Sequence, residues 1–395
     1  MTSSKLVRLL AAVTSLARFS MADYPEVTSD QCDCYLTNGS SGHYFRTHQF
    51  FDFRDREASV NVPALIDSSS DTSDAPPTND YLRSDEWTQF WTMQGWTNAQ
   101  SLGSNESDAS VLMVQSPNNI YFQDNRDPDA ESKTYLTLRT ARQREFQSSA
   151  EFVSVTEDYH YLSARMYART IGAPGAVTAM FTYRNTGDDA TELETVQESD
   201  LELRTMDPPG YAQYTNQPSY TLDGPNISEA TRNATIPRQK RWSDWATYRM
   251  DWGPGATTWF IDGVETASIA FQVPRDPSML IFNAWSNGGS WTGNMSVGSE
   301  AYLQIQWIEL VYNRSTSAAQ RKREESGSGV NTASLYSKEK RAEEACHNVC
   351  SIDETTTTGT AVLMQGGASR ALEQIGGVGA ISFWVTMVSI IALAL

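Results

Sequence analysis

The stretch Glu198-Ser199-Asp200-Leu201-Glu202 places a carboxylate at every second position of a short alternating run. On a β-strand, residues two apart point to the same face, so all three acids would lie side by side. Like charges aligned in this way repel one another, which makes the pattern unfavourable for structure alone. The pattern suits chemistry that needs a proton donor beside a nucleophile. An acidic edge strand that blocks aggregation and a Ca²⁺ site are the alternatives.

The spacing of the two glutamates fits one kind of sugar chemistry. Strand residues rise ~3.3 Å each, which puts the Cα atoms of Glu198 and Glu202 about 13 Å apart and lets their carboxyls approach to about 5 Å. Glycosidases that retain the anomeric configuration need about 5–5.5 Å, and inverting enzymes need more. Asp200 lies between them and can share a proton with Glu198. Crowded like charges raise the pKa of at least one group, so one carboxyl can stay protonated near neutral pH.

The sequence around this stretch is typical of a β protein. Short alternating segments recur between turn signals, and no long segment has helical periodicity. These segments are 135–139, 161–169, 177–183, 199–203, 257–261, 279–285 and 303–312. Asp262-Gly263 follows one of them and predicts a two-residue hairpin turn. Many short strands separated by turns predict a sandwich or jelly roll.

Both ends of the chain resemble targeting segments. Lys5 and Arg8 precede a short apolar run, and small residues before Asp23 predict signal-peptide cleavage after Ala22. At the other end, 381–395 is apolar and uncharged, and follows small residues and a spacer. This order predicts a GPI-attachment signal whose ω-site is one of Gly367, Ala368 and Ser369, and a short tail anchor is the alternative.

The composition restricts the partners. The formal net charge is −18, which disfavours nucleic acid and anionic membrane surfaces but allows a neutral polysaccharide. We therefore expect contact with the membrane only through a lipid anchor. We also expect the protein to be a monomer. Secretion agrees with six N-glycosylation sequons. They begin at Asn38, Asn105, Asn226, Asn233, Asn294 and Asn313.

The four cysteines form two close pairs, Cys32 with Cys34 and Cys346 with Cys350. A bridge within the first pair would close a strained ring, so we expect disulfides between the N-terminal and the C-terminal pair. Each would close a very long loop and stabilise the fold by about 4 kcal/mol in the chain-entropy model. A zinc site is the alternative, although the spacings are poor for a zinc finger and secretion favours oxidation.

The stretch 198–202 resembles the ExDxE signature of glycoside hydrolase family 16, the group of laminarinases, lichenases and xyloglucan endotransglycosylases. Other blocks resemble the family in the same order over roughly residues 120–312. They are 175–181 (GAVTAMF), 214–216 (YTN), 248–254 (YRMDWGP), 259–263 (WFIDG) and 283–291 (NAWSNGGSW). The stretch 32–54 most resembles secreted fungal members. Two departures leave the linkage specificity open: Ala246 occupies a position where many members carry histidine, and the bulged form of the signature is absent.

The resemblance implies a concanavalin-like β-jelly roll with a concave cleft for a β-glucan chain. It implies Glu198 as nucleophile, Glu202 as general acid/base and Asp200 as the assisting carboxylate, acting with retention. No cofactor is expected, and no residues are assigned to a structural Ca²⁺. The expected organisation is a signal peptide at 1–22, the catalytic jelly roll at 23–314, a polar linker at 315–345, a cysteine-containing segment at 346–368 and a GPI signal at 369–395.

Sugar rings stack on aromatic side chains, so some of the aromatic residues are candidates for substrate binding. We expect Trp285 and Trp291 to stack on sugar, and Tyr183 and Asn216 to line the subsite next to the scissile bond. Core packing is the alternative for each aromatic residue. Three tryptophans cannot be placed from the sequence, and two others are assigned to the core by their apolar neighbours. The unplaced ones are Trp87, Trp91 and Trp96, and the core ones are Trp252 and Trp259.

The sequence thus predicts a secreted, GPI-anchored enzyme at the extracellular face of the plasma membrane or the cell wall of a fungus. The expected reaction is retaining endo-cleavage of β-1,3- or mixed β-1,3/1,4-glucan. The first alternative is a cell-wall glucan transglycosylase with the same carboxylates, which passes the glycosyl group to another sugar. The second is an inactive glucan-binding surface protein.

Overall fold

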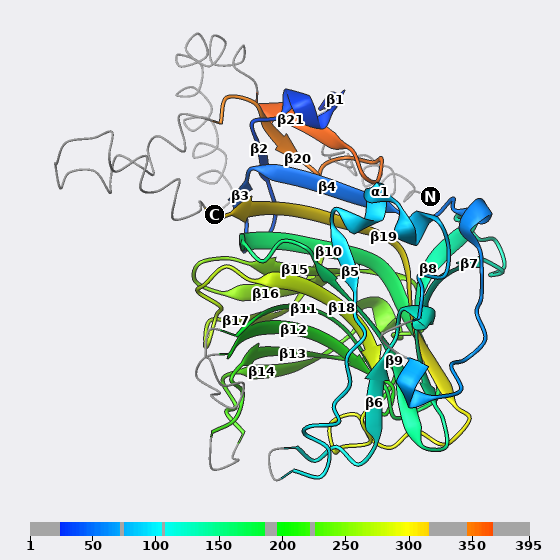
Figure 1. The fold of residues 1–395 in the computed structure, drawn as a ribbon. Coiled ribbons are helices and arrows are strands. Elements are labelled where there is room, and N and C mark those ends of the chain that lie inside the picture. The colour runs from blue at the N-terminus through cyan, green and yellow to red at the C-terminus, as the bar shows by residue number, and fades with distance from the viewer. Residues whose placement is uncertain are drawn as a thin grey trace, which may run out of the picture.

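The computed structural model of the protein describes residues 24–71, 75–104, 107–185, 196–221, 226–315 and 346–365. The predicted signal peptide, most of the linker, the GPI signal and the sequon at Asn105 lie outside these ranges. Within them, no helix is long and apolar enough to cross a bilayer. The described strands form a large sheet of sixteen strands and a small sheet of five (Figure 1).

The large sheet folds over into two layers. Six strands form the layer that we call the cleft layer: β14 (Thr231–Thr235), β13 (Tyr211–Gln217), β12 (Val196–Arg204), β11 (Val177–Asn185), β18 (Met279–Trp285) and β9 (Phe146–Ser154). The path continues through the outer layer: β8 (Thr134–Arg142), β19 (Glu300–Arg314), β10 (Tyr159–Gly172), β15 (Ala246–Trp252), β16 (Thr257–Ile261) and β17 (Val264–Ile269). The prediction of an all-β sandwich of the jelly-roll class is confirmed.

Four further strands pair with strands in the middle of this order. They are β4 (Thr47–Asp52) on β19, β7 (Ile120–Asp124) on β8, and both β5 (Trp91–Met93) and β6 (Leu112–Gln115) on β9. Every segment that the alternating pattern assigned to a strand lies within one. At Asp262-Gly263, φ is 48° and 76°, as a two-residue turn with two left-handed residues requires, so the predicted β16–β17 hairpin is confirmed.

The hydrophobic core fills the space between the two layers. Leu201 and Leu203 of β12 reach it from the cleft layer, and Met250 and Trp259 reach it from the outer layer. Trp252 and Trp259 are fully buried, which confirms their assignment to the core. The alternation of β12 therefore sends its apolar side chains inward and its acidic side chains to the opposite face.

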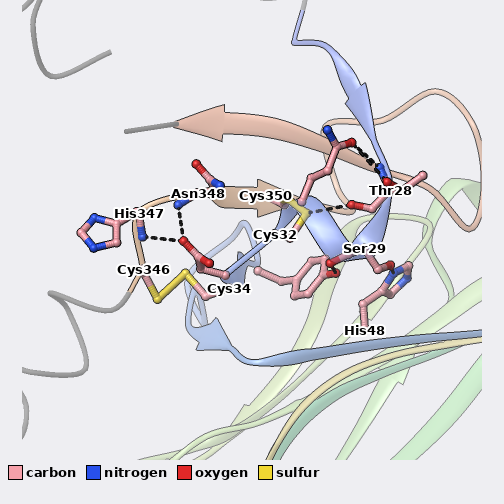
Figure 2. Close-up of a disulfide and its surroundings, with 12 residues drawn as sticks. Thr28, Ser29, Cys32, Cys34, His48, Cys346, His347, Asn348 and Cys350 are labelled. Atoms are coloured by element: carbon pink, nitrogen blue, oxygen red, sulfur yellow. Dashed lines mark hydrogen bonds between the residues drawn. A yellow bond between two sulfur atoms is a disulfide. The ribbon is translucent and has the colours of Figure 1, made fainter. Parts of the chain in front are cut away.

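The small sheet joins the two ends of the described chain. Its order is β1 (Glu26–Val27), β21 (Ala361–Gln365), β20 (Val349–Ser351), β2 (Cys34–Leu36) and β3 (Tyr44–Phe45). Disulfides connect Cys32 with Cys350 and Cys34 with Cys346, which confirms the predicted pairing of the two ends (Figure 2). Figure 1 shows this sheet beside β4 and β19 of the outer layer.

A buried ionic network lies where the small sheet meets the outer layer. Asp353, which follows β20, accepts hydrogen bonds from Arg165 at 2.6 Å and from Arg249 at 3.4 Å. Arg249 also forms a two-bond ion pair with Asp251. Burial opposes ionisation of Asp353, but the two arginines prevail and hold its pKa below the ordinary value. The C-terminal segment therefore supplies the counter-charge for two buried cations.

Candidate active site

The three carboxylates lie on β12, an inner strand of the cleft layer. β12 pairs with β11 on one side and β13 on the other, and Glu198 lies opposite Tyr183 and Gln217. Ser199 points to the opposite face, where its hydroxyl donates to the Asn216 side-chain oxygen at 2.6 Å in the interior. Glu198, Asp200 and Glu202 thus share one face, as their spacing predicts.

That face forms part of the wall of a cavity of about 630 Å³. The volume lies in the range of known ligand-binding clefts. β12 supplies the three carboxylates, and β11, β18 and β9 supply a mixed polar and apolar wall beside them. The side chains from these three strands are Ala179, Phe181, Tyr183, Met279, Ile281, Asn283, Trp285, Glu151 and Val153. On the β11 side, the residue opposite Glu202 is Ala179, whose small side chain leaves room above that carboxyl.

Glu198 and Asp200 form a pair of carboxyls that favours a proton on one of its members. Burial raises the pKa of Glu198 to about 7. A hydrogen bond with Asp200 lowers this pKa, and the negative charges of Glu202 and Glu151 raise it further. Asp200 is only 4% exposed. Burial, then the charges of Glu198 and Glu202, hold the pKa of Asp200 well above its ordinary value. A protonated Asp200 can therefore donate to an ionised Glu198 and stabilise its charge.

Glu202 lies in a different setting on the same strand. Burial raises its pKa to about 7, while a hydrogen bond from Trp291 and the positive charge of Arg204 favour the ionised form. The indole Nε1 of Trp291 donates to Glu202 Oε1 at 3.2 Å. A group with a pKa near 7 can carry a proton in one step of a reaction and release it in the next. The cavity thus holds one candidate nucleophile and one candidate acid/base.

The predicted substrate-binding residues do not all lie in the cavity. Tyr183 and Trp285 line it, and Trp291 is 37% exposed beside Glu202. The prediction for Asn216 is wrong. Asn216 pairs with Ser199, so both face the interior, and the Asn216 amide donates to the backbone oxygen of Phe271 at 2.9 Å. Cross-strand register decides which face a residue takes, and the sequence did not provide that register.

Sequence reasoning missed most of the other residues of this cavity wall, among them Glu151, Asn283 and Trp96. Glu151 on β9 accepts a hydrogen bond from the indole of Trp96 at 3.1 Å and one from the amide of Asn283 at 3.4 Å. Burial raises the pKa of Glu151. A single acid between Ala150 and Phe152, both buried in the core, was a usable signal that Glu151 faces the cavity. Trp96, which is 42% exposed, carries no comparable local signal.

The predicted glycosylation sites differ in their surroundings. Asn226, Asn233 and Asn294 are exposed. Asn38 is exposed but accepts a hydrogen bond from Arg249 at 3.0 Å. Asn313 is half-buried, and its amide both accepts from the backbone of Arg46 and donates to Tyr44. Glycosylation stays a prediction at all of them.

Among the described residues, no group of three or more His, Cys, Asp or Glu side chains has an arrangement that could hold a metal ion. We therefore assign no residues to a structural Ca²⁺, and the expectation that no cofactor is needed stays a prediction.

Comparison with known proteins identifies the family. The family model Glycosyl hydrolases family 16 matches residues 109–309. A beta-glucanase of Paenibacillus polymyxa is 30% identical over 69 residues, which are 17% of this chain and 29% of that protein. A xylanase/beta-glucanase of Ruminococcus flavefaciens is 23% identical over 264 residues, 66% of this chain and 28% of that protein. The chain thus spans less than a third of the length of these relatives.

Solved structures are similar at low identity. A β-1,3-1,4-glucanase (lichenase) from a mouse hindgut metagenome is 17% identical, with 68% of this chain and 100% of that chain covered and a TM-score of 0.44. The catalytic domain of an endo-1,3-β-glucanase (laminarinase) from Thermotoga petrophila is 17% identical, with 58% and 93% covered and a TM-score of 0.46. Because the family model covers just over half of the 395 residues, this chain belongs to Glycosyl hydrolases family 16.

Proposed function

We propose that the protein is a retaining endo-β-glucanase that cleaves β-1,3- or mixed β-1,3/1,4-glucan. The observation that carries the proposal is the row of three carboxylates on one face of β12, in a cavity, with the pKa values of Glu198 and Glu202 both near 7. The beta-glucanase and the xylanase/beta-glucanase among its relatives support this class of substrate.

In the proposed first step, protonated Glu202 gives its proton to the glycosidic oxygen while the Glu198 carboxylate attacks the anomeric carbon. The glycosidic C–O bond breaks, the shortened glucan leaves as an alcohol, and a glycosyl ester forms on Glu198. In the second step, the Glu202 carboxylate takes a proton from a water molecule, whose oxygen attacks the anomeric carbon and releases Glu198. Two inversions give net retention. Asp200 contributes its hydrogen bond to Glu198, which orients the nucleophile.

The proposal extends to the place of action. A secreted chain anchored by GPI at a fungal cell surface would meet β-glucan as a wall polymer. The predicted leader and anchor, the sequons and the two disulfides support an extracellular location. The net charge of −18 is compatible with a neutral polysaccharide partner.

The test is a nucleophile variant with chemical rescue. Glu198→Ala should lose turnover on laminarin and lichenan by roughly 10³-fold or more, while binding of the glucan survives. Azide should restore cleavage of an activated glycoside, because it replaces the carboxylate as nucleophile, and should give a glycosyl azide of inverted configuration. Glu202→Ala is the matched variant, for which azide should instead give the azide of retained configuration. Near-normal turnover of Glu198→Ala would overturn the nucleophile assignment.

The products of the wild-type protein decide between the proposal and its two alternatives. Reducing ends that first appear in the β configuration support retaining hydrolysis. Glucan chains that become longer in the presence of an acceptor would instead show a transglycosylase. Binding without cleavage of either glucan would show a glucan-binding protein.

A further inference from the structure

We propose that Arg204 is a positioning residue for Glu202 and acts through Trp291. This inference rests on the proposed function, in which Glu202 is the acid/base. Arg204 lies two residues after Glu202 on β12, so both side chains leave the strand on the same face. The guanidinium carbon of Arg204 lies 4.2 Å from the centre of the Trp291 ring, in a cation–π contact.

Arg204 is itself firmly held. Its Nε and Nη2 donate to the two carboxylate oxygens of Asp207 at 2.9 and 2.7 Å. Gln213 on β13 donates to the same carboxylate at 2.8 Å. The ion-pair side chains are 17% and 13% exposed, so solvent screens this pair less than an ordinary surface pair. A two-bond Arg–carboxylate pair fixes the plane of the guanidinium. The plane on which Trp291 rests is therefore set by Asp207 and Gln213.

Trp291 receives a second contact from the same arginine. Nη1 of Arg204 donates to the backbone oxygen of Trp291 at 3.3 Å, so both the ring and the backbone of this residue are held. The preceding residue is fixed from another segment, because Asp108 accepts from the backbone N–H of Ser290 at 2.7 Å. The loop that carries Trp291 is thus tied to β12 at one point and to the segment before β6 at another.

The consequence for the chemistry follows from the bond between Trp291 and Glu202. The indole Nε1 donates to Glu202 Oε1, which leaves the other carboxylate oxygen to carry the catalytic proton toward the cavity. Indole has a donor and no acceptor, so this bond works for either protonation state of Glu202 and favours the ionised one. Arg204 fixes the indole and thereby decides which oxygen faces the glycosidic bond.

The charged groups around Glu202 determine the expected effect on its titration. Glu198 and Asp200 lie on its own strand, Arg204 favours ionisation and Asp207 opposes it. The residues opposite Glu202 on the two neighbouring strands are Ala179 and Gln213, which carry no charge. Removal of the Arg204 charge or of the Trp291 donor should therefore raise the apparent pKa of Glu202.

The experiment compares Arg204→Met, Arg204→Lys and Trp291→Phe with the wild-type protein. One readout is the pH profile of kcat and kcat/KM on glucan. The other is the titration of Glu202 by ¹³C NMR in protein labelled at glutamate Cδ, with the signal assigned from Glu202→Gln. This second readout needs no activity, so it tests the contact to Glu202 even if the proposed function fails.

For Arg204→Met and Trp291→Phe, the Glu202 titration and the alkaline limb of the profile should both move up by about half a pH unit or more. In Arg204→Met, kcat should fall roughly tenfold or more, because the acid is misplaced, while KM changes little. Arg204→Lys keeps the charge but not the planar contact, so it should lose kcat with a smaller shift of the titration.

The matched control is Arg54→Met, two residues after β4. Arg54 also makes a two-bond pair, with Asp52, and lies over an aromatic ring, Phe50, at 5.8 Å. Its removal should leave the Glu202 titration and the profile unchanged. An unchanged titration in both Arg204→Met and Trp291→Phe would overturn the inference. If the wild-type protein cleaves neither glucan but the two variants show the shift of the Glu202 titration, the proposed function is rejected and the inference about the contact to Glu202 stands.

Discussion

At the scale of the residue, one strand gives two glutamates similar pKa values by different means. Glu198 is flanked by Asp200, a carboxyl whose pKa is raised, whereas Glu202 is flanked by an indole donor and an arginine. The first setting supports a carboxylate that must attack carbon, and the second supports a group that must give and take a proton. The division of roles that we propose therefore rests on the different neighbours of the two glutamates.

The raised pKa of Glu202 makes the stability of the protein depend on pH. Its ordinary value is 4.5 and its folded value is about 7, so the folded state binds the proton more tightly than the unfolded state between these values. Stability from this group is complete below about pH 4.5 and is lost as the pH rises through 7. Glu202→Gln should match the wild type near pH 4 and exceed it at pH 8, by about 1–2 kcal/mol because the carboxyl stays accessible from the cavity.

Urea unfolding of both proteins at pH 4, 6 and 8 measures this difference in the free energy of unfolding. Glu131→Gln, at an exposed position, is the control and should show a difference that does not grow with pH. The raised pKa would be contradicted if the stability of Glu202→Gln relative to the wild type were the same at pH 8 as at pH 4.

The residues of the site also show how far sequence reasoning reaches. The face of Glu198, Asp200 and Glu202 follows from alternation along one strand, which needs no knowledge of any partner. The prediction for Asn216 failed because its face depends on the register between β12 and β13, in which Asn216 pairs with the inward-facing Ser199. Trp96 could not be placed from the sequence because it reaches the cavity from a segment before β6, through a bond to Glu151 on β9.

At the scale of the element, the small sheet does more than join the ends of the chain. It lies over outward-facing residues of the outer layer, where Arg165 and Arg249 would otherwise meet solvent. Here both arginines are buried, and Asp353 from the C-terminal segment bonds to each. The cysteine spacing predicted the link between the ends. It could not predict this ionic network, because Asp353 lies more than a hundred residues away from both arginines in sequence.

Asp353→Ala should therefore destabilise the protein strongly. Removal of one partner of a buried ion pair leaves an unpaired charge and costs about 3–5 kcal/mol. Guanidinium unfolding at neutral pH measures the loss. Asp158→Ala is the matched control, because Asp158 pairs with Arg314 at the surface and its loss should cost under about 1 kcal/mol. Equal losses in the two variants would show that the network under the small sheet is not energetically important.

At the scale of the whole molecule, the two disulfides hold the same two segments together. Cys32–Cys350 spans 318 residues and Cys34–Cys346 spans 312, so the two bridges enclose nearly the same loop. Either bridge alone keeps that long loop closed in the unfolded chain. The second bridge then closes only a small ring between the two segments. The stabilisation by the pair should therefore be strongly non-additive.

This argument gives a double-mutant cycle with a definite sign. Cys32→Ala/Cys350→Ala and Cys34→Ala/Cys346→Ala should each lose about 2 kcal/mol, which is the entropy of the small ring. The variant without any of the four cysteines should exceed the sum of these losses by about 3 kcal/mol, because only then does the unfolded chain regain the long loop. Denaturant unfolding without reductant measures all four corners of the cycle. Losses that simply add would mean that the two segments stay associated in the unfolded chain, and that the bridges stabilise the fold through local packing instead.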